Sequence, residues 1–234
     1  MAHTTLGNTG WRVPRLGLGT FTWGLDVAQD APSTLLAAYL EAGGSLVEVS
    51  SWRGSPAAEH LLGDALRSEV AREEIQISLV GTRLTASGAV RDTSRAGVLD
   101  ALDASLTRLE TDHVDLYLLE LAGRPPAGDW QTLADTLAWV LRSGRAHYVG
   151  LGGATPWQVA LVGSLLGADA QGGLAAVSSE LSVCIPRARL SELGEAAGAV
   201  GAGVVGWAPL GRGALVVPDH GRPQASQSAE PVAL

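Results

Sequence analysis

The sequence predicts one α/β domain of the (β/α)8 TIM-barrel type, with an N-terminal β-hairpin and truncated to about seven βα units. Short apolar runs alternate with longer stretches of helical period, and the starts of successive runs lie 28 to 39 residues apart. One strand, one helix and two loops need this length, and strands that are apolar throughout are typical of a parallel sheet covered on both faces. The predicted strands are 16–19, 45–49, 75–80, 114–119, 147–150, 175–178 and 203–207.

Local signals predict the other elements. Residues 4–13 form two short extended pieces around a Gly-Asn turn, which indicates a hairpin. Ser55 and Thr155 each precede a proline, a pair typical of a helix start. Apolar residues recur on one face of the stretches 98–109 and 133–141, which predicts two helices. Gly144 follows the second stretch at a position where the end of a helix favours glycine.

A repeated βα unit allows a doubly wound open sheet or a (β/α)8 barrel. Gly17 and Gly19 do not complete the three-glycine turn of a dinucleotide-binding sheet, which favours the barrel. Residues 1–217 then form one domain with the hairpin at 4–13, and the Pro-, Gln- and Ser-rich stretch 218–234 is a flexible C-terminal tail.

Seven strands leave a barrel with two open edges, which a folded protein has to cover. We expect association to cover them, by a second copy in a homodimer ahead of another protein. A short strand at 214–217 is the remaining option.

The chain is acidic, since 24 Asp and Glu against 16 basic residues give a net charge of −8, and every basic residue is arginine. Scattered arginines on an acidic chain predict no nucleic-acid partner and no membrane binding. Residues 1–8 lack the pattern of a signal peptide, so we expect a cytoplasmic protein. The uncharged stretch 146–168 contains glycines and a proline, which indicates a buried strand and a helix rather than a membrane span.

A single cysteine, Cys184, excludes an internal disulfide, and we expect its side chain to be buried. His3, His60, His113 and His147 show no metal-ligand spacing, so no metal site is expected.

Nine short segments form a pattern along the chain when their order and spacing are considered together. They are 6–10 (LGNTG), 16–20 (LGLGT), 41–43 (EAG), 59–63 (EHLLG), 105–109 (SLTRL), 114–117 (VDLY), 143–145 (SGR), 149–151 (VGL) and 207–213 (WAPLGRG). Together they resemble the landmarks of the aldo-keto reductases, from Thr4 to about Leu215. The resemblance implies a (β/α)8 barrel capped by an N-terminal hairpin, and reduction of aldehydes and ketones with NADPH.

In that family a tyrosine is the general acid, a lysine paired with an aspartate lowers its pKa, and a histidine orients the substrate. The resemblance places Glu48 at the aspartate, Arg53 at the tyrosine, Val80 at the lysine and Glu120 at the histidine. No catalytic role is expected for these replaced positions. Arginine keeps its proton to a pKa above roughly 12, so Arg53 cannot act as the acid, and no lysine occurs anywhere in the chain.

The cofactor positions are replaced as well. The family's Ser-Asn pair, which holds the nicotinamide carboxamide, falls on Gly152 and Gly153, the following glutamine on Ser178 and the ring-stacking tyrosine on Leu181. NADPH is implied by the resemblance alone, and we predict no cofactor bound in the ordinary mode. The candidate cofactor-binding residues are Gly19, Thr20, Trp207, Ala208, Pro209, Leu210 and Gly211.

Three interpretations of Glu48, Arg53 and Glu120 stay open. They form a structural ion cluster, or Arg53 binds a small anionic ligand such as a carboxylate or phosphate, or the two glutamates carry new acid–base chemistry. Trp23 and Trp52 either line a pocket or pack as a lid. We predict a pseudoenzyme without carbonyl reductase activity that acts as a binding or assembly subunit. The alternatives are an NADPH-dependent oxidoreductase with a rebuilt active site and a small-anion sensor that uses Arg53.

Overall fold

Seven parallel strands form one curled sheet in which each strand pairs with the next one along the chain. The computed structural model describes residues 1–24, 31–50, 56–81, 83–85, 88–90, 92–121, 129–167 and 172–216. The order β11-β10-β9-β8-β5-β4-β3 never reverses, so the sheet winds as a barrel and is not doubly wound. The predicted fold class and all seven predicted strands are confirmed. The strands are β3 (Leu18–Gly19), β4 (Leu46–Ser50), β5 (Gln76–Gly81), β8 (Val114–Glu120), β9 (Ala146–Gly152), β10 (Ala176–Glu180) and β11 (Gly203–Trp207).

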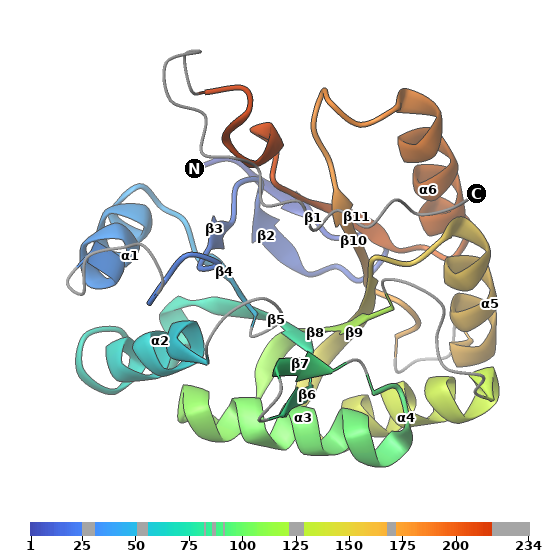
Figure 1. The fold of residues 1–234 in the computed structure, drawn as a ribbon, viewed down its shortest axis with the longest axis horizontal. Helices are drawn as coiled ribbons and strands as arrows, with labels where there is room; N and C mark the ends of the chain where they lie inside the picture. Colours follow the sequence, from blue (N-terminus) through green and yellow to red (C-terminus); the bar gives the residue numbers. More distant parts are fainter. Residues whose placement is uncertain are drawn as a thin grey trace.

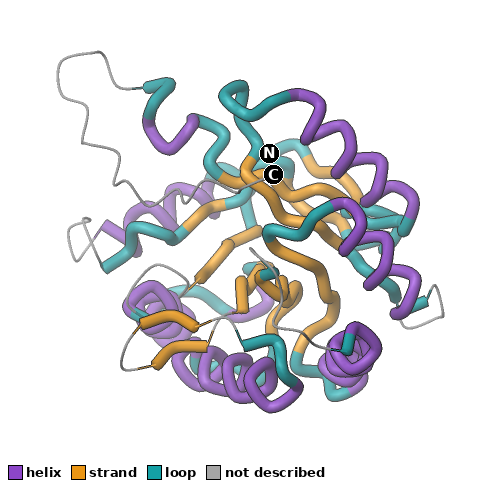
Figure 2. Tube along the Cα trace, turned by 45° about the vertical axis from the view of Figure 1, so that its right-hand side comes forward, coloured by secondary structure: helices purple, strands orange, loops and turns teal. Residues whose placement is uncertain are grey.

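The helices lie on the outer face of the sheet (Figure 1), and Figure 2 shows the strands inside this layer. They are α1 (Ala31–Glu41), α2 (Ala57–Ser68), α3 (Arg95–Leu109), α4 (Trp130–Arg142), α5 (Pro156–Leu166) and α6 (Arg187–Ala199). The side chains of Ser94 and Asp129 cap α3 and α4 by accepting backbone N–H groups at 3.1 and 3.0 Å. At the predicted start of α5, the Gln158 side chain accepts the N–H of Thr155 at 2.9 Å. Local sequence therefore sets where these helices begin.

The N-terminal hairpin closes the interior of the curled sheet at the amino ends of the strands. Its strands are β1 (His3–Thr5) and β2 (Arg12–Pro14), which confirms the prediction. Gly7 has φ +53° and lies against the carbonyl of Gly201, where a Cβ atom would collide. The next residue, Asn8, donates its N–H to that carbonyl at 2.8 Å. Side chains of the hairpin region and of the strands form an inner apolar cluster inside the sheet. It contains Leu6, Val13, Val80, Leu116, Leu118, Ala175 and Ala176.

Two ion pairs join neighbouring elements of the scaffold. The carboxylate of Glu59 on α2 is fully buried and accepts hydrogen bonds from Ser105 Oγ at 2.9 Å and from Arg108 Nε, both on α3. Asp115 accepts hydrogen bonds from Arg72 and from the N–H of Ile77, each at 2.8 Å, and so links β8 to β5. These bonds satisfy charges that the interior could not otherwise hold.

Three details differ from the expectations. An antiparallel hairpin of β6 (Arg83–Thr85) and β7 (Gly88–Val90) was not predicted, because three-residue strands are too short to show a period. The expectation that Cys184 is buried is wrong: it is exposed, because it lies in the loop after β10 and not on the buried face of an element. Residues 214–216 form turns after the short helix η2 (Gly211–Gly213) and no strand, while 217 and the predicted tail lie outside the described residues.

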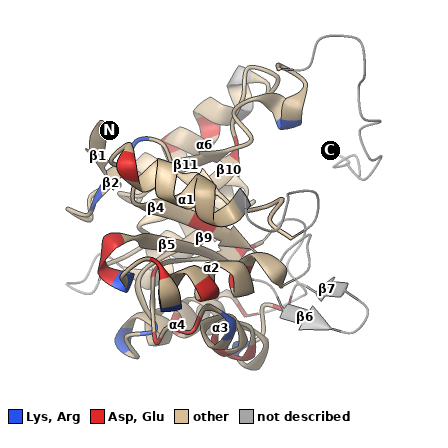
Figure 3. Ribbon diagram, turned by 90° about the vertical axis from the view of Figure 1, so that its left-hand side faces the viewer, with Lys and Arg blue, Asp and Glu red and all other residues tan. Residues whose placement is uncertain are grey.

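In the described part of the chain, no helix is both long enough and apolar enough to cross a membrane. The uncharged stretch 146–168 contains β9 and α5, as predicted. Acidic and basic residues are mixed on the outer helices α2 and α3 on the face that Figure 3 shows.

Replacing Arg108 by methionine leaves the Glu59 carboxylate buried without its counter-charge. We expect the free energy of unfolding to fall by about 3 to 5 kcal/mol, measured by urea denaturation. Arg67→Met is the matched control, since Arg67 pairs with Asp64 and Glu110 on the surface and its loss should change stability little. Equal effects of the two substitutions would contradict a structural role for the Glu59–Arg108 pair.

Candidate functional site

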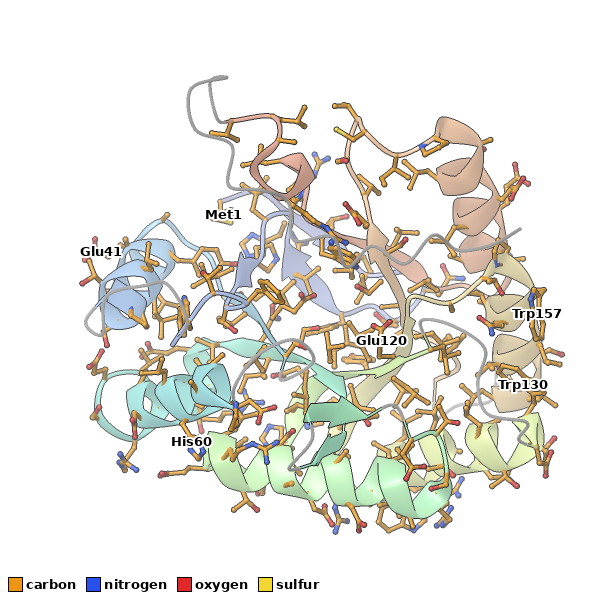
Figure 4. The ribbon with its side chains drawn as sticks, viewed as in Figure 1. Met1, Glu41, His60, Glu120, Trp130 and Trp157 are labelled. Atoms are coloured by element: carbon orange, nitrogen blue, oxygen red, sulfur yellow. The ribbon has the colours of Figure 1, made fainter. Side chains whose placement is uncertain are left out.

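The interior of the sheet carries polar side chains toward the carboxyl ends of its strands. Glu48 pairs in register with Ser78, and Ser78 with Leu116, which belongs to the inner cluster. Paired residues of parallel strands point to the same face and every second residue repeats it, so Glu48, Ser78, Val80 and Glu120 face inward. Glu120 lies within the ring of strands in Figure 4.

The structure therefore brings together three of the four positions that the resemblance maps, Glu48, Val80 and Glu120. Arg53 and Trp52 lie outside the described residues. The predicted pairing of Arg53 with Glu48 and Glu120 therefore stays a prediction.

Glu48 is a partly buried carboxyl group on the inward face of β4. Burial first, and then the negative charge of Glu120, raise its pKa from 4.5 to about 7. Among the described residues no hydrogen bond or ion pair reaches this carboxyl group. Glu48 is therefore protonated at a higher pH than an exposed glutamate.

The hydroxyl of Ser78 lies beside Glu48 on the neighbouring strand. Ser78 is 2% exposed, and its Oγ has no hydrogen-bond partner among the described residues. A buried hydroxyl without a partner costs about 1 to 3 kcal/mol, and the Tyr117 hydroxyl in the outer core is in the same state. Ser78 was not predicted from the sequence, although its place two residues before Val80 puts it on the same inward face.

Val80 is an apolar wall of this site. Its side chain is 8% exposed and packs in the inner cluster with Leu116 and Leu118. Neither it nor any other residue can supply an ammonium group to Glu48, because the chain contains no lysine. The electrostatic partner that the resemblance implies for this carboxyl group is replaced by hydrocarbon.

The Glu120 carboxylate lies over Gly152. A Cβ atom at Gly152 would lie 2.5 Å from Glu120 Oε2, the end of a flexible side chain that can move aside. Gly152 is the position of the serine that the resemblance assigns to the nicotinamide carboxamide. Glycine has no side-chain hydroxyl, so the residues present do not supply the hydrogen bond that the resemblance assigns to this position.

The candidate cofactor residues lie at the two edge strands. Thr20 follows β3, and its hydroxyl and N–H both donate to the carbonyl of Glu48, at 3.0 and 3.1 Å. Gly19 is exposed. Trp23 is buried in the outer core, so its side chain packs there and does not line a pocket. Thr20 thus anchors Glu48 to the edge strand.

At the other edge, Trp207 ends β11 and the loop that follows it turns sharply. Ala208 at φ +50° and Arg212 at φ +54° adopt left-handed conformations that are uncommon for residues other than glycine. Arg212 lies over the Trp207 ring at 5.1 Å and bonds the Glu180 carboxylate at 2.7 Å. Glu180 and Arg212 were not predicted from the sequence, although Arg212 belongs to the segment 207–213. Pro209, Leu210 and Gly211 lie in this loop, and Leu210 is exposed.

The parallel strands follow one another in chain order, the hairpin closes the sheet at the amino ends of the strands, and polar side chains lie at the carboxyl ends. These features define a protein of the (β/α)-barrel class, in which active and binding sites lie at the carboxyl ends of the strands. The chain belongs to the aldo/keto reductase family, whose model matches residues 15–232. It is 26% identical over 226 residues to "Uncharacterized oxidoreductase YrpG" of Bacillus subtilis (strain 168), covering 92% of this chain and 68% of that protein. It is 30% identical over 124 residues to "Aldo-keto reductase YhdN" of the same organism, covering 50% of this chain and 37% of that protein.

The raised pKa of Glu48 predicts a pH dependence of stability. Between pH 4.5 and about 7 the folded chain binds the Glu48 proton more tightly than the unfolded chain does, so stability falls as pH rises through this window. The fall amounts to up to about 3 kcal/mol from this one group. In Glu48→Gln we expect this part of the fall to vanish, as measured by urea denaturation at several pH values.

Glu41→Gln, a change at an exposed residue of α1, is the control and should keep the wild-type pH dependence. If Glu48→Gln also keeps it, the Glu48 carboxyl group is not desolvated in solution.

Proposed function

We propose that this chain is a degenerate member of the aldo/keto reductase family that lacks carbonyl reductase activity and acts as a binding or assembly subunit. One observation carries the proposal: Val80 stands where the family has its lysine, so that among the described residues the carboxyl group of Glu48 has a second carboxyl group, Glu120, and no cation beside it.

The chemistry of carbonyl reduction needs a proton donor at the developing alkoxide. Arginine at position 53 cannot be that donor, because its guanidinium keeps its proton at any physiological pH. Loss of a positioned general acid lowers a rate by about 10² to 10⁴. Glycine at position 152 adds a second obstacle, since it has no side chain to hold the nicotinamide carboxamide.

One observation favours a rebuilt active site instead. A carboxyl group with a pKa near 7 is what a general acid needs at neutral pH, and Glu48 has such a pKa. This rival function makes Glu48 the proton donor and Glu120 the charge that keeps its proton in place.

Turnover with NADPH and nitrobenzaldehyde separates the two functions. We expect no NADPH oxidation above the protein-free rate and no quenching of tryptophan fluorescence when NADPH is added to the purified protein. Oxidation that is abolished in Glu48→Gln but kept in Glu41→Gln would establish the rebuilt site and defeat the proposal.

The assembly role draws support from the two sheet edges. In the described sheet β3 pairs only with β4, and β11 only with β10, so each presents an open side. Large apolar side chains are exposed beside both edges: Leu16 and Phe21 next to β3, and Val204, Leu210 and Leu215 on or after β11. A second copy of the chain is the partner that we propose for this surface.

Light scattering at micromolar concentration is therefore expected to give at least twice the chain mass of 24.0 kDa. The double substitution Val204→Glu and Leu215→Glu should lower the mass to that of one chain, because it places charge in the apolar surface. Trp157→Glu, at an exposed tryptophan of α5, is the control and should leave the mass unchanged. A wild-type mass equal to that of one chain would contradict the proposed homodimer.

A further inference from the structure

The edge strand β11 directs part of its backbone away from the sheet in a regular pattern. The N–H of Gly203 and the carbonyl of Trp207 bond to residues that flank β10, at 2.9 and 3.0 Å. Every second residue of a parallel strand bonds to the same neighbour, so the backbone groups of Val204 and Gly206 point to the other side. Both residues are exposed, and among the described residues no strand pairs with this side of β11.

We propose that β11 of a second copy pairs antiparallel with this edge, around a twofold axis that passes between the two Val205 residues. Val204 of each copy then lies opposite Gly206 of the other, and each such pair exchanges two hydrogen bonds. This register uses the outward N–H and carbonyl groups of both residues in both copies. The inference rests on the proposed homodimer and specifies which strands meet and in which register.

The charge of this region allows two copies to approach each other. Residues 196–211, which include β11, contain no charged side chain, although the chain has a net charge of −8. The strand itself, GVVGW, has neither the charged residues nor the proline that commonly keep edge strands apart. A second acidic copy therefore meets no like charge along the strand.

The side chains on the outer face of this edge suit the register. Val205 packs against the inner cluster, so Val204 and Gly206 face the other side of the sheet, where Val204 is 41% exposed. A Cβ atom at Gly206 would lie 2.9 Å from the Cβ of Leu181, so Leu181 lies on that same face beside the glycine. Leu181 is 39% exposed. The pairing therefore places Val204 of one copy next to Leu181 of the other and covers both apolar side chains.

The other open edge does not support an equivalent pairing. The strand at that edge, β3, has two residues, and both of them pair with β4. A contact between β11 of one copy and β3 of the next would also leave a free edge at each end, so that further copies could add. A contact between two β11 strands is self-complementary and closes after two copies.

Hydrogen exchange resolved by residue, measured by nuclear magnetic resonance on the full chain, tests the pairing. At about a hundredfold above the dissociation constant of the dimer, we expect the N–H groups of Val204 and Gly206 to exchange roughly tenfold more slowly than at about tenfold below it. The N–H groups of Gly203, Val205 and Trp207 are the internal control. They point to β10, so their protection should not depend on concentration in this way.

A disulfide cross-link tests the register. The proposed pairing makes the two Val205 residues a pair without mutual hydrogen bonds, with their Cα atoms about 4.5 Å apart, which a disulfide can span. Val205→Cys, in a chain that also carries Cys184→Ser, should give a covalent dimer on a non-reducing gel after oxidation with copper phenanthroline. Trp157→Cys in the same background is the control and should stay a single chain, although position 157 is 55% exposed.

Four results would each overturn the inference. Protection of Val204 and Gly206 that does not change with concentration, at the mass of one chain, would show that a segment of the same chain covers the edge. A doubled mass without that protection would place the dimer contact elsewhere and leave the homodimer standing. Equal cross-linking of Val205→Cys and Trp157→Cys would exclude the register, and a wild-type mass of one chain without protection would exclude the dimer itself. None of these results bears on the loss of reductase activity, which the turnover experiment decides.

Discussion

A parallel sheet that curls on itself has to fill its own interior with side chains from the strands. The position of the hairpin and the chemistry of the candidate site both depend on which side chains fill that space. At the amino ends the filling is apolar: Leu6 and Val13 of the hairpin region meet Leu116, Leu118 and Ala176. Toward the carboxyl ends it becomes polar, with carboxyl and hydroxyl groups in place of hydrocarbon. A charge in that upper layer is next to the packed core, which is why the pKa of Glu48 rises to about 7. The buried carboxylate of Glu59 on α2 differs in that Arg108 pairs with it.

The segments that carry the family resemblance turn out to be parts of the scaffold. Glu59 and Arg108 belong to two different segments, 59–63 and 105–109, and bond each other between α2 and α3. Asp115, in a third segment, joins β8 to β5, and Gly7 lets the hairpin approach Gly201. A sequence can keep these contacts and the fold while the residues at the carboxyl ends change, because fold and chemistry depend on different positions. The resemblance is therefore strong evidence for the barrel and weak evidence for the reaction.

The curled sheet was predictable because each of its seven strands has a local signal. Apolar runs locate these strands, Thr155 and the proline after it locate the start of α5, and the spacing between runs favours the sequential order. The site was predictable only in part. Position in the sequence places Glu48, Val80 and Glu120 on one face, but it does not reveal that Ser78 lacks a partner or that Arg212 bonds Glu180. These facts depend on side-chain packing, which a single sequence does not encode locally. The exposure of Cys184 has a different reason, since this residue lies in the loop after β10 and not on the buried face of an element.

The replaced positions are better understood as one connected change than as separate losses. Valine at position 80 takes away positive charge beside Glu48, and glutamate at position 120 adds negative charge, so both changes act on the same carboxyl group in the same direction. The carboxylate of Glu120 lies over Gly152. Two neighbouring, partly buried carboxyl groups repel each other, and protonation of one of them relieves the repulsion. Protonation of Glu48 therefore links this site to the stability of the fold.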